Sequence, residues 1–245
     1  MIMLNEIREK FRKIVDENNL LNEEIFIKAR VLTPEEAIGN PEEKDFPLLK
    51  GKERMIQADF KGSYGQAFTD MYGNFQGKIS DIVAMELKNN YRRALFVASI
   101  NAVMRYLKLI EKTIHCKDEE PFECSQMIEK FILENYPEVK KIALVGYQPA
   151  FVQVLSKRFV LNVLDLDRDN TGKMKFGVPI LNGNVCTEDT IKWGDIVLVT
   201  GSVFVNGTID EIVRYKNVDR IFFYGVTVAG IAELLHLNRL CFKGH

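Results

Sequence analysis

Short apolar runs alternate with amphipathic segments throughout the second half of the chain. Near-continuous apolar runs bounded by turn residues are typical of strands that are buried on both faces of a parallel sheet. The segments between these runs repeat apolar residues with a helical period. We therefore predict a Rossmann-like α/β domain with a parallel sheet of about five strands. The expected strands lie at 141–148, 159–167, 195–201, 220–227 and 239–242, and the expected helices at 125–136, 150–158, 208–216 and 229–237.

The first half has a less regular pattern. Apolar residues on one helical face predict an N-terminal helix, and helical periods return later. The segment 33–53 carries three of the seven prolines and is expected to be a loop, and the glycine-rich 62–69 is expected to be a hairpin loop. The N-terminal helix is expected at 4–15, strands at 25–32 and 54–60, and further helices from residue 79 and over 92–111.

These two patterns divide the chain into two predicted domains. Residues 1–112 form a smaller α+β domain, because a helix, strands and further helices follow one another there. Residues 113–245 form the Rossmann-like domain. The polar stretch 113–124, which contains Pro121, is the predicted boundary.

Composition narrows the classes of partner. A net charge of -1 over 245 residues argues against an extended surface for nucleic acid or membranes. No apolar run approaches the roughly 18 residues that a membrane span needs. Four cysteines without a close-paired motif are typical of a reduced, intracellular protein, so we expect a cytoplasmic location. A homo-oligomer is compatible with this composition.

The stretch TGSVFVNGT places small and polar residues where the predicted strand 195–201 ends. Thr200 and Gly201 follow the apolar run, and Asn206-Gly207-Thr208 precedes the next helix. A turn explains Asn206-Gly207, and a capping box between Thr208 and Glu211 explains the helix start. A glycine at a strand end also allows a ligand or another backbone to approach closely. Both interpretations stay open.

Three further predicted strands end in residues that could take part in ligand binding. Gly146 is the only glycine where a dinucleotide fingerprint needs three, so NAD or FAD binding in the usual mode is disfavoured. Asp165 and Asp167 could bind a ribose or a metal ion, or could form a solvated charge cluster. Thr227 follows the strand 220–227, at the edge where parallel sheets bind ligands.

In the first half, Asn101 lies among apolar neighbours in a predicted helix. A buried amide needs hydrogen-bond partners, so Asn101 either bonds a neighbouring backbone or points into a cleft. We expect Asn101→Ala to weaken ligand binding more than it lowers stability. The three histidines form no sequence-local metal motif, although a site assembled from distant segments stays open.

Taken in order, five segments resemble an uncharacterised family called "putative heavy-metal chelation". In that family a domain similar to the enolase N-terminal domain precedes a Rossmann-like domain, and the cleft between them is the implied active site. One departure is GVTVAG at 225–230, where the family usually has Pro and Ser or Thr. The segments that carry the resemblance are GQAFT at 65–69, GKISDIVAMELKNNYRRALFVASINAVMRYL at 77–107, KIALVGYQPAF at 141–151, DIVLVTGSVFVNGTIDEIV at 195–213 and YGVTVAG at 224–230.

We therefore expect a protein that binds a small anionic or metal-chelating ligand in an interdomain cleft, with a divalent or transition metal as the implied cofactor. A lyase- or transferase-like enzyme acting on a nucleotide-bearing or phosphorylated substrate is the first alternative. An oligomeric scaffold without a small ligand is the second. The expected ligand-binding residues are Gly65, Thr69, Asn101, Gly146, Thr200, Gly201, Asn206, Thr208 and Thr227, and the expected metal ligands are Asp165 and Asp167.

Overall fold

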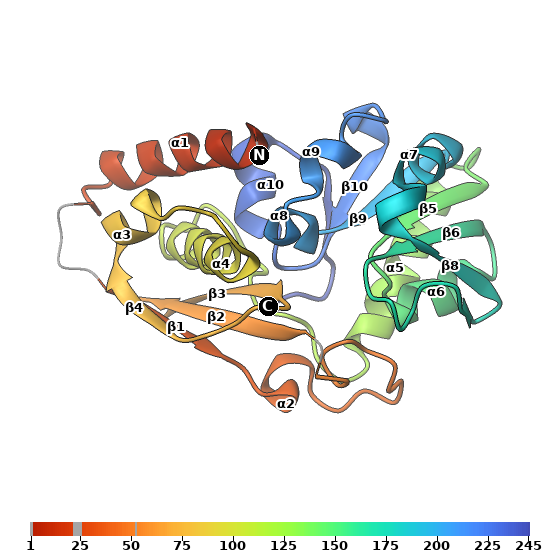
Figure 1. Cartoon of the computed structure of the whole chain (residues 1–245), viewed down its shortest axis with the longest axis horizontal. Coiled ribbons are helices and arrows are strands. Elements are labelled where there is room, and N and C mark those ends of the chain that lie inside the picture. Colours follow the sequence, from red (N-terminus) through yellow and green to blue (C-terminus); the bar gives the residue numbers. More distant parts are fainter. Residues whose placement is uncertain (1, 22–25, 52) are drawn as a thin grey trace.

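The computed structural model of the protein describes residues 2–21, 26–51 and 53–245. Within these residues the strands form two sheets, a four-stranded sheet from the first half and a seven-stranded sheet from the second (Figure 1). Ile25, the first residue of the strand predicted at 25–32, lies outside the described residues. The predicted order of a smaller α+β part followed by a Rossmann-like α/β part is confirmed.

The seven-stranded sheet has the strand order β11-β10-β9-β5-β6-β8-β7, and β7 alone runs antiparallel to its neighbour. The chain moves from β5 through β6 to β8, then crosses to β9 and continues to β10 and β11. The strand order therefore reverses between β5 and β9, as in dinucleotide-binding Rossmann domains. The strands are β5 (Lys141–Val145), β6 (Val160–Asp165), β7 (Met174–Lys175), β8 (Val178–Asn182), β9 (Ile196–Thr200), β10 (Ile221–Tyr224) and β11 (Arg239–Leu240).

The prediction of about five strands missed β7 and β8. β7 is only two residues long, and β8 interrupts its apolar residues with Pro179. A proline is tolerated at that position because β6 pairs with β8 only at Ile180–Asn182, so Pro179 faces the short edge strand β7 alone. Neither segment therefore has the continuous apolar run that identified the other strands.

Alternate residues of the central strands face two different hydrophobic clusters. In β9, Val197 and Val199 join the larger cluster, whereas Ile196 and Leu198 join the cluster with α5 and α6 on the other face. Both faces of the sheet are therefore covered, as the continuous apolar runs predicted. The second-half helices are α5 (Glu120–Asn135), α6 (Pro149–Leu155), α7 (Gly183–Trp193), α8 (Ser202–Asn206), α9 (Ile209–Ile212) and α10 (Ala229–Leu235), with a 3-10 turn at Val218–Arg220.

The four-stranded sheet is antiparallel, with the order β3-β2-β1-β4. Lys61 (φ 51°) and Gly62 (φ 80°) connect β2 to β3 in a tight turn that matches the twist of the strands. The glycine-rich 62–69 is therefore mainly a strand, and the expectation of a hairpin loop there was wrong beyond the turn itself. The strands are β1 (Phe26–Val31), β2 (Arg54–Phe60), β3 (Ser63–Thr69) and β4 (Phe75–Lys78).

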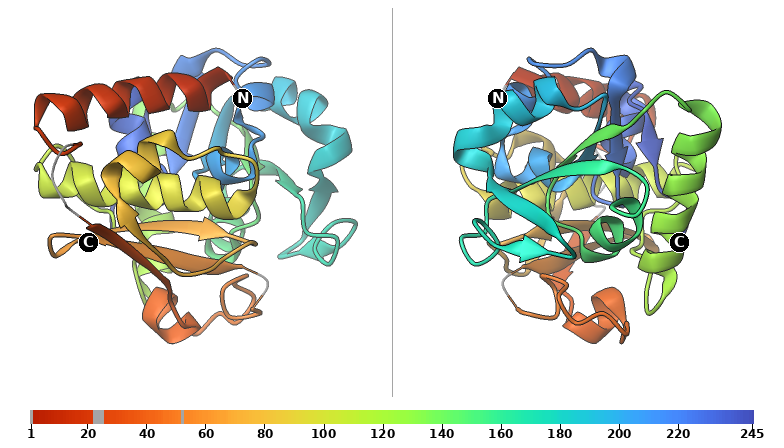
Figure 2. Two further views of the ribbon diagram at one scale, coloured as in Figure 1. Left: turned by 60° about the vertical axis from the view of Figure 1, so that its left-hand side comes forward. Right: turned by 90° about the vertical axis from the view of Figure 1, so that its right-hand side faces the viewer.

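Helix α4 packs on the four-stranded sheet, and α1, α8 and α10 cover its other sides (Figures 1 and 2). Every residue from Arg93 to Met104 is buried, as expected for a helix that is surrounded on all sides. The helix ends earlier than predicted, because Lys108 adopts a left-handed conformation (φ 58°). The first-half helices are α1 (Ile2–Glu17), α2 (Pro34–Ile38), α3 (Ile79–Ala84) and α4 (Asn90–Tyr106).

The larger hydrophobic cluster joins α1, α4 and the four-stranded sheet to α8, α9, α10 and one face of the seven-stranded sheet. The two predicted domains therefore share a core, and the boundary at 112/113 stays a prediction. α5 begins at Glu120, inside the polar stretch expected to separate them. In the described part of the chain, no helix combines the length and the apolar character that crossing a membrane requires.

The side chain of Asn101 links the two parts of this shared core by hydrogen bonds. It is fully buried, and its Nδ2 donates to the carbonyl oxygens of Gln66 (3.0 Å), Val226 (3.1 Å) and Thr227 (3.2 Å). Its Oδ1 accepts from Gly230 N at 2.7 Å. One amide therefore joins β3 to the loop after β10 and to the start of α10. Of the two roles that the sequence left open for Asn101, these contacts favour backbone bonding.

We expect Asn101→Ala to lower the free energy of unfolding by about 2–4 kcal/mol, because it leaves several buried backbone groups without partners. Urea denaturation would measure the loss. Any effect on ligand binding would be smaller and indirect, the reverse of what a side chain pointing into a cleft would give.

Asn135→Ala is the matched control, because Asn135 is an exposed helical asparagine whose side chain donates to the Phe131 carbonyl within the same helix. It should change the free energy of unfolding by less than about 0.5 kcal/mol. Equal stability of the two variants would contradict the role that we assign to Asn101.

Candidate ligand-binding cavity

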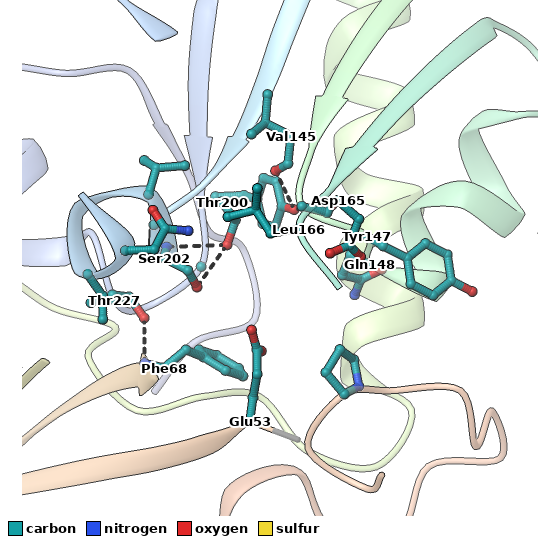
Figure 3. Close-up of a pocket in the computed structure, with 18 of the residues that line it drawn as sticks. Glu53, Phe68, Val145, Tyr147, Gln148, Asp165, Leu166, Thr200, Ser202 and Thr227 are labelled. Carbon is teal, nitrogen blue, oxygen red and sulfur yellow. Dashed lines mark hydrogen bonds between the residues drawn. The ribbon is translucent and has the colours of Figure 1, made fainter. Parts of the chain in front are cut away.

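A cavity of about 540 Å³ lies beyond the carboxyl ends of β5, β6, β9 and β10. Its other walls include residues of segments 38–51, 53–70 and 115–124, together with residues at the start of α7 and at 240–241. Figure 3 shows residues of both kinds facing each other, with Thr200 and Asp165 opposite Glu53 and Phe68. The cavity includes the point between β5 and β9 where the strand order reverses, which is the usual ligand position in such sheets.

The ends of β5 and β9 meet closely at this point. A side chain at Gly146 would lie 2.6 Å from Thr200 Cγ2, and Gly146 has a φ of 91°, so only glycine fits there. The Tyr224 hydroxyl donates to the Gly146 carbonyl at 3.0 Å. Gly146 and Thr200 therefore form a tight floor for the cavity.

The stretch after β9 is a short helix, α8, rather than an open turn. Gly207 ends this helix with a φ of 80°, so the turn expected at Asn206-Gly207 is the end of a helix that the sequence analysis did not predict. The predicted capping box at Thr208 was wrong, because Thr208 is not extended (φ -91°, ψ -4°) and its side chain makes no capping bond. Its hydroxyl instead donates to Asn206 Oδ1 at 2.8 Å, so the two predicted residues bond each other at the cavity wall.

Gly201 and Thr227 connect the loops after β9 and β10. A side chain at Gly201 would lie 2.7 Å from Val228 N, so the close approach that this glycine permits is that of another backbone. Thr227 Oγ1 accepts from Phe68 N at 3.1 Å, which links the loop after β10 to β3 (Figure 3). Both residues line the cavity while holding its walls together.

An acidic cluster lines the cavity, and it consists of Glu53, Asp70, Asp165 and Asp167. Asp165 accepts from Asp167 N (2.8 Å) and from Asn170 Nδ2 (3.0 Å), which orient its carboxylate at the end of β6. Burial raises the pKa of Asp165, against the effect of these hydrogen bonds. Among the described residues that line the cavity there is no lysine or arginine. The described lining therefore favours cations over anions.

Within the acidic cluster, the negative charge of Glu53 is the one that neighbouring groups offset least. In the described part of the chain its carboxylate forms no hydrogen bond or ion pair, and it points into the cavity (Figure 3). Burial raises its pKa to about 7, and the negative charges of Asp165, Asp70 and Asp167 act in the same direction. Glu53 can therefore exchange a proton or bind a cation near neutral pH.

A thiol cluster of Cys116, Cys124 and Cys241 also lines the cavity, together with His115. Burial raises the pKa of Cys116, and the neighbouring thiols of Cys124 and Cys241 add to the rise. Burial lowers the pKa of His115 to about 4, so its imidazole is neutral at pH 7. The four residues come from three separate segments of the chain, so no local motif could reveal them.

Segment 39–51 closes one side of the cavity with Phe46, Pro47 and Leu48. Asp45 holds this segment in place. Its carboxylate accepts a hydrogen bond from the Tyr147 hydroxyl (2.6 Å) and forms an ion pair with Lys175 (2.8 Å). Although burial raises the pKa of Asp45, hydrogen bonds from Lys175, Lys50 and Tyr147 outweigh burial and lower it to about 2. The predicted loop is thus an ordered wall.

The cavity gathers most of the residues that the sequence analysis proposed. Gly65 and Asn101 do not line it: a side chain at Gly65 would lie 2.3 Å from Ala102 N, so this glycine lets β3 pack against α4. The sequence analysis missed Glu53, Asp70 and the thiol cluster, because nothing in their local patterns distinguishes them. The predicted residues that line the cavity are Thr69, Gly146, Thr200, Gly201, Asn206, Thr208 and Thr227, with Asp165 and Asp167.

Sequence and fold comparisons agree on the class of protein. Residues 130–238 match the family model DUF364, described as "Putative heavy-metal chelation". The resemblance drawn from the five sequence segments is thereby confirmed, and the match covers most of the Rossmann-like part. No curated protein matches the sequence.

Two crystal structures of DUF364 proteins of unknown function have a similar fold. The protein from Pyrococcus horikoshii is 18% identical with a TM-score of 0.51, and the match covers 92% of this chain and 79% of that one. The protein from Desulfitobacterium hafniense is 12% identical with a TM-score of 0.51, and the match covers 75% of this chain and 72% of that one. At these identities the likeness concerns the fold alone.

We expect Glu53→Gln to change how stability depends on pH. Since the folded-state pKa of Glu53 lies above the ordinary value of 4.5, the folded protein binds this proton more tightly than the unfolded chain. Stability should therefore fall as pH rises from about 4.5 to about 7 and then level off. Over this pH window, the free energy of unfolding of the variant should rise relative to that of the wild type by about 1–3 kcal/mol.

Urea denaturation at pH 5 and pH 8 would measure the difference. Glu9→Gln is a suitable control, because Glu9 is exposed on α1 and does not line the cavity. If the free energy of unfolding differs between Glu53→Gln and the wild type by the same amount at both pH values, the pKa of Glu53 is not raised.

Proposed function

We propose that the protein binds a metal ion carried by a small organic chelator, with the acidic cluster as the binding surface. The observation that carries this proposal is the Glu53 carboxylate, which points into the cavity without a described partner. In this proposal the cavity is the cleft between the two predicted domains. The family description, heavy-metal chelation, is consistent with such a ligand.

The volume of the cavity supports a small molecule over a bare ion. About 540 Å³ is within the range of pockets that bind small molecules. An empty space of that size argues against a scaffold with a filled cleft. The polar side chains of Thr200, Ser202 and Asn206 supply hydrogen bonds for an organic ligand.

The number of protein ligands supports a metal that arrives with ligands of its own. In the described parts of the chain, no group of three or more His, Cys, Asp or Glu side chains is arranged to hold a metal ion. Glu53 and Asp165 could each contribute an oxygen, and the chelator would supply the rest. The acidic cluster also weighs against the anionic ligand that the sequence left open, because like charges repel.

A second candidate is a nucleoside ligand without phosphate groups. Asp165 ends β6 about 20 residues after Gly146, where Rossmann domains place the acid that bonds ribose hydroxyls. Phosphorylated substrates are disfavoured, since the described lining has no basic side chain to bind phosphate. A proton-transferring enzyme would use Glu53, whose pKa of about 7 suits general acid–base catalysis.

We expect the cobalt(II) complex of diethylenetriamine, a cationic chelate, to raise the melting temperature, because a ligand that binds only the folded state stabilises it. The anionic cobalt(II) complex of nitrilotriacetate and inorganic phosphate should give no shift. Affinity should increase from pH 6 to pH 8 as Glu53 loses its proton. Titration calorimetry would measure it.

Glu53→Gln and Asp165→Asn should each weaken binding of the cationic chelate by about tenfold or more, and Glu53→Gln should remove the pH dependence. Glu9→Gln should bind as the wild type does. A shift with adenosine that Asp165→Asn abolishes, and none with the cationic chelate, would favour the nucleoside instead. Binding that is unchanged in both cavity variants would overturn the proposal.

A further inference from the structure

One side of the cavity is apolar, and the acidic cluster does not extend to it. We call Ile38, Phe46, Leu48 and Phe68 the apolar wall, because all four line the cavity and pack in one hydrophobic cluster. Ile38, Phe46 and Leu48 are almost fully buried, whereas Phe68 is only partly buried. Phe68 is therefore the member of the apolar wall whose side chain a ligand in the cavity can cover.

The ring of Phe68 is held in place by its neighbours. It packs edge-on with the imidazole of His115, with 5.2 Å between the ring centroids. Burial lowers the pKa of His115 to about 4, so this imidazole adds no charge to the apolar side of the cavity at pH 7. A fixed and uncharged aromatic surface favours an aromatic ring in the ligand, because paired rings attract each other beyond the effect of the area that they bury.

The apolar wall and the acidic cluster meet at the start of β2. Glu53 directly precedes β2, and two residues further along Met55 pairs with Phe68 of β3. Two residues of an extended strand span about 7 Å. The carboxylate of Glu53 and the ring of Phe68 project into the cavity from this pair of strands (Figure 3). A ligand whose ring lies on Phe68 can therefore reach Glu53 with a short side chain.

The end of that side chain should be cationic. In the part of the chain that the structure describes, the Glu53 carboxylate forms no hydrogen bond or ion pair. The described cavity lining also contains no lysine or arginine that could neutralise it. A protonated amine would offset the charge of the carboxylate and donate hydrogen bonds to it. The two features together, an aromatic ring and a nearby cation, define a class of small molecule.

We propose that the cavity binds an arylalkylamine, whose aromatic ring packs against Phe68 and whose cationic nitrogen group, protonated or bound to the metal ion, lies beside Glu53. This inference rests on the proposed function for the cationic end of the ligand. It adds the chemical class of the organic part, which the acidic cluster by itself does not specify.

The test is a ligand-observed NMR titration of the full-length protein with three metal-free probes. Phenethylamine carries both features, propylamine lacks the ring, and 3-phenylpropionate has a carboxylate in place of the cation. We expect phenethylamine to bind with a dissociation constant of about 1 mM or lower, which a small fragment can reach. Propylamine should bind about tenfold more weakly or worse, because it buries no ring. The anionic 3-phenylpropionate should not bind, since the acidic cluster repels it.

Phe68→Ala should lower the affinity for phenethylamine about tenfold and leave the weaker binding of propylamine unchanged. Tyr64→Ala is the matched control, because Tyr64 is an exposed aromatic residue of the same strand that does not line the cavity. It should bind phenethylamine as the wild type does. Circular dichroism would establish that each variant is folded. Phe68→Leu keeps most of the apolar volume, and it should lower the affinity about threefold if the alanine variant does not fold.

Equal affinities for phenethylamine and propylamine would overturn the proposal, as would an equal loss in Phe68→Ala and Tyr64→Ala. The cobalt(II) complex of diethylenetriamine, which has no aromatic ring, separates this proposal from the proposed function. Binding of that complex with no gain from a ring would contradict the arylalkylamine alone. Ring-dependent binding of phenethylamine without binding of the complex would support the arylalkylamine and contradict the metal chelate.

Discussion

The burial of α4 is the constraint on which the rest of the structure depends. A helix surrounded on all sides must be covered by the four-stranded sheet below and by α8 and α10 above, so the two halves of the chain cannot separate without exposing it. A polar group inside such a contact is tolerated only when it is satisfied. Asn101 meets that condition with four backbone bonds, and it thereby fixes the loop after β10 relative to β3.

The cavity is a consequence of this arrangement. The reversal of strand order between β5 and β9 leaves a crevice beyond the sheet, as it does in other doubly wound sheets. Here β3 and segment 39–51 cover the crevice. The hydrogen bond from Phe68 N to Thr227 holds β3 in place, and the contacts of Asp45 with Tyr147 and Lys175 hold segment 39–51. The walls are therefore built mainly by backbone and structural contacts, while Glu53 and the thiols remain for chemistry.

The chemistry of the cavity differs between its parts. Carboxylates line the cavity at Glu53 and Asp165, and thiols line it at Cys116, Cys124 and Cys241. Burial shifts both sets in the same direction, toward protonated and uncharged forms, because a low-dielectric surrounding penalises negative charge. Both sets of groups therefore hold their protons more tightly in the folded protein than they would in water.

The sequence by itself determined the Rossmann-like architecture, because runs such as Ile196–Thr200 are apolar on both faces and can only be buried in a covered parallel sheet. It also located the strand-end residues Gly146, Thr200 and Asp165, since parallel strands end at one edge. It missed β7 and β8, whose short and interrupted runs carry no such signal. Only the tertiary structure decided which residues meet: Glu53 faces Asp165, and Cys116 joins Cys124 and Cys241. Local patterns report whether a residue is buried, whereas contacts between distant segments depend on how the whole chain packs.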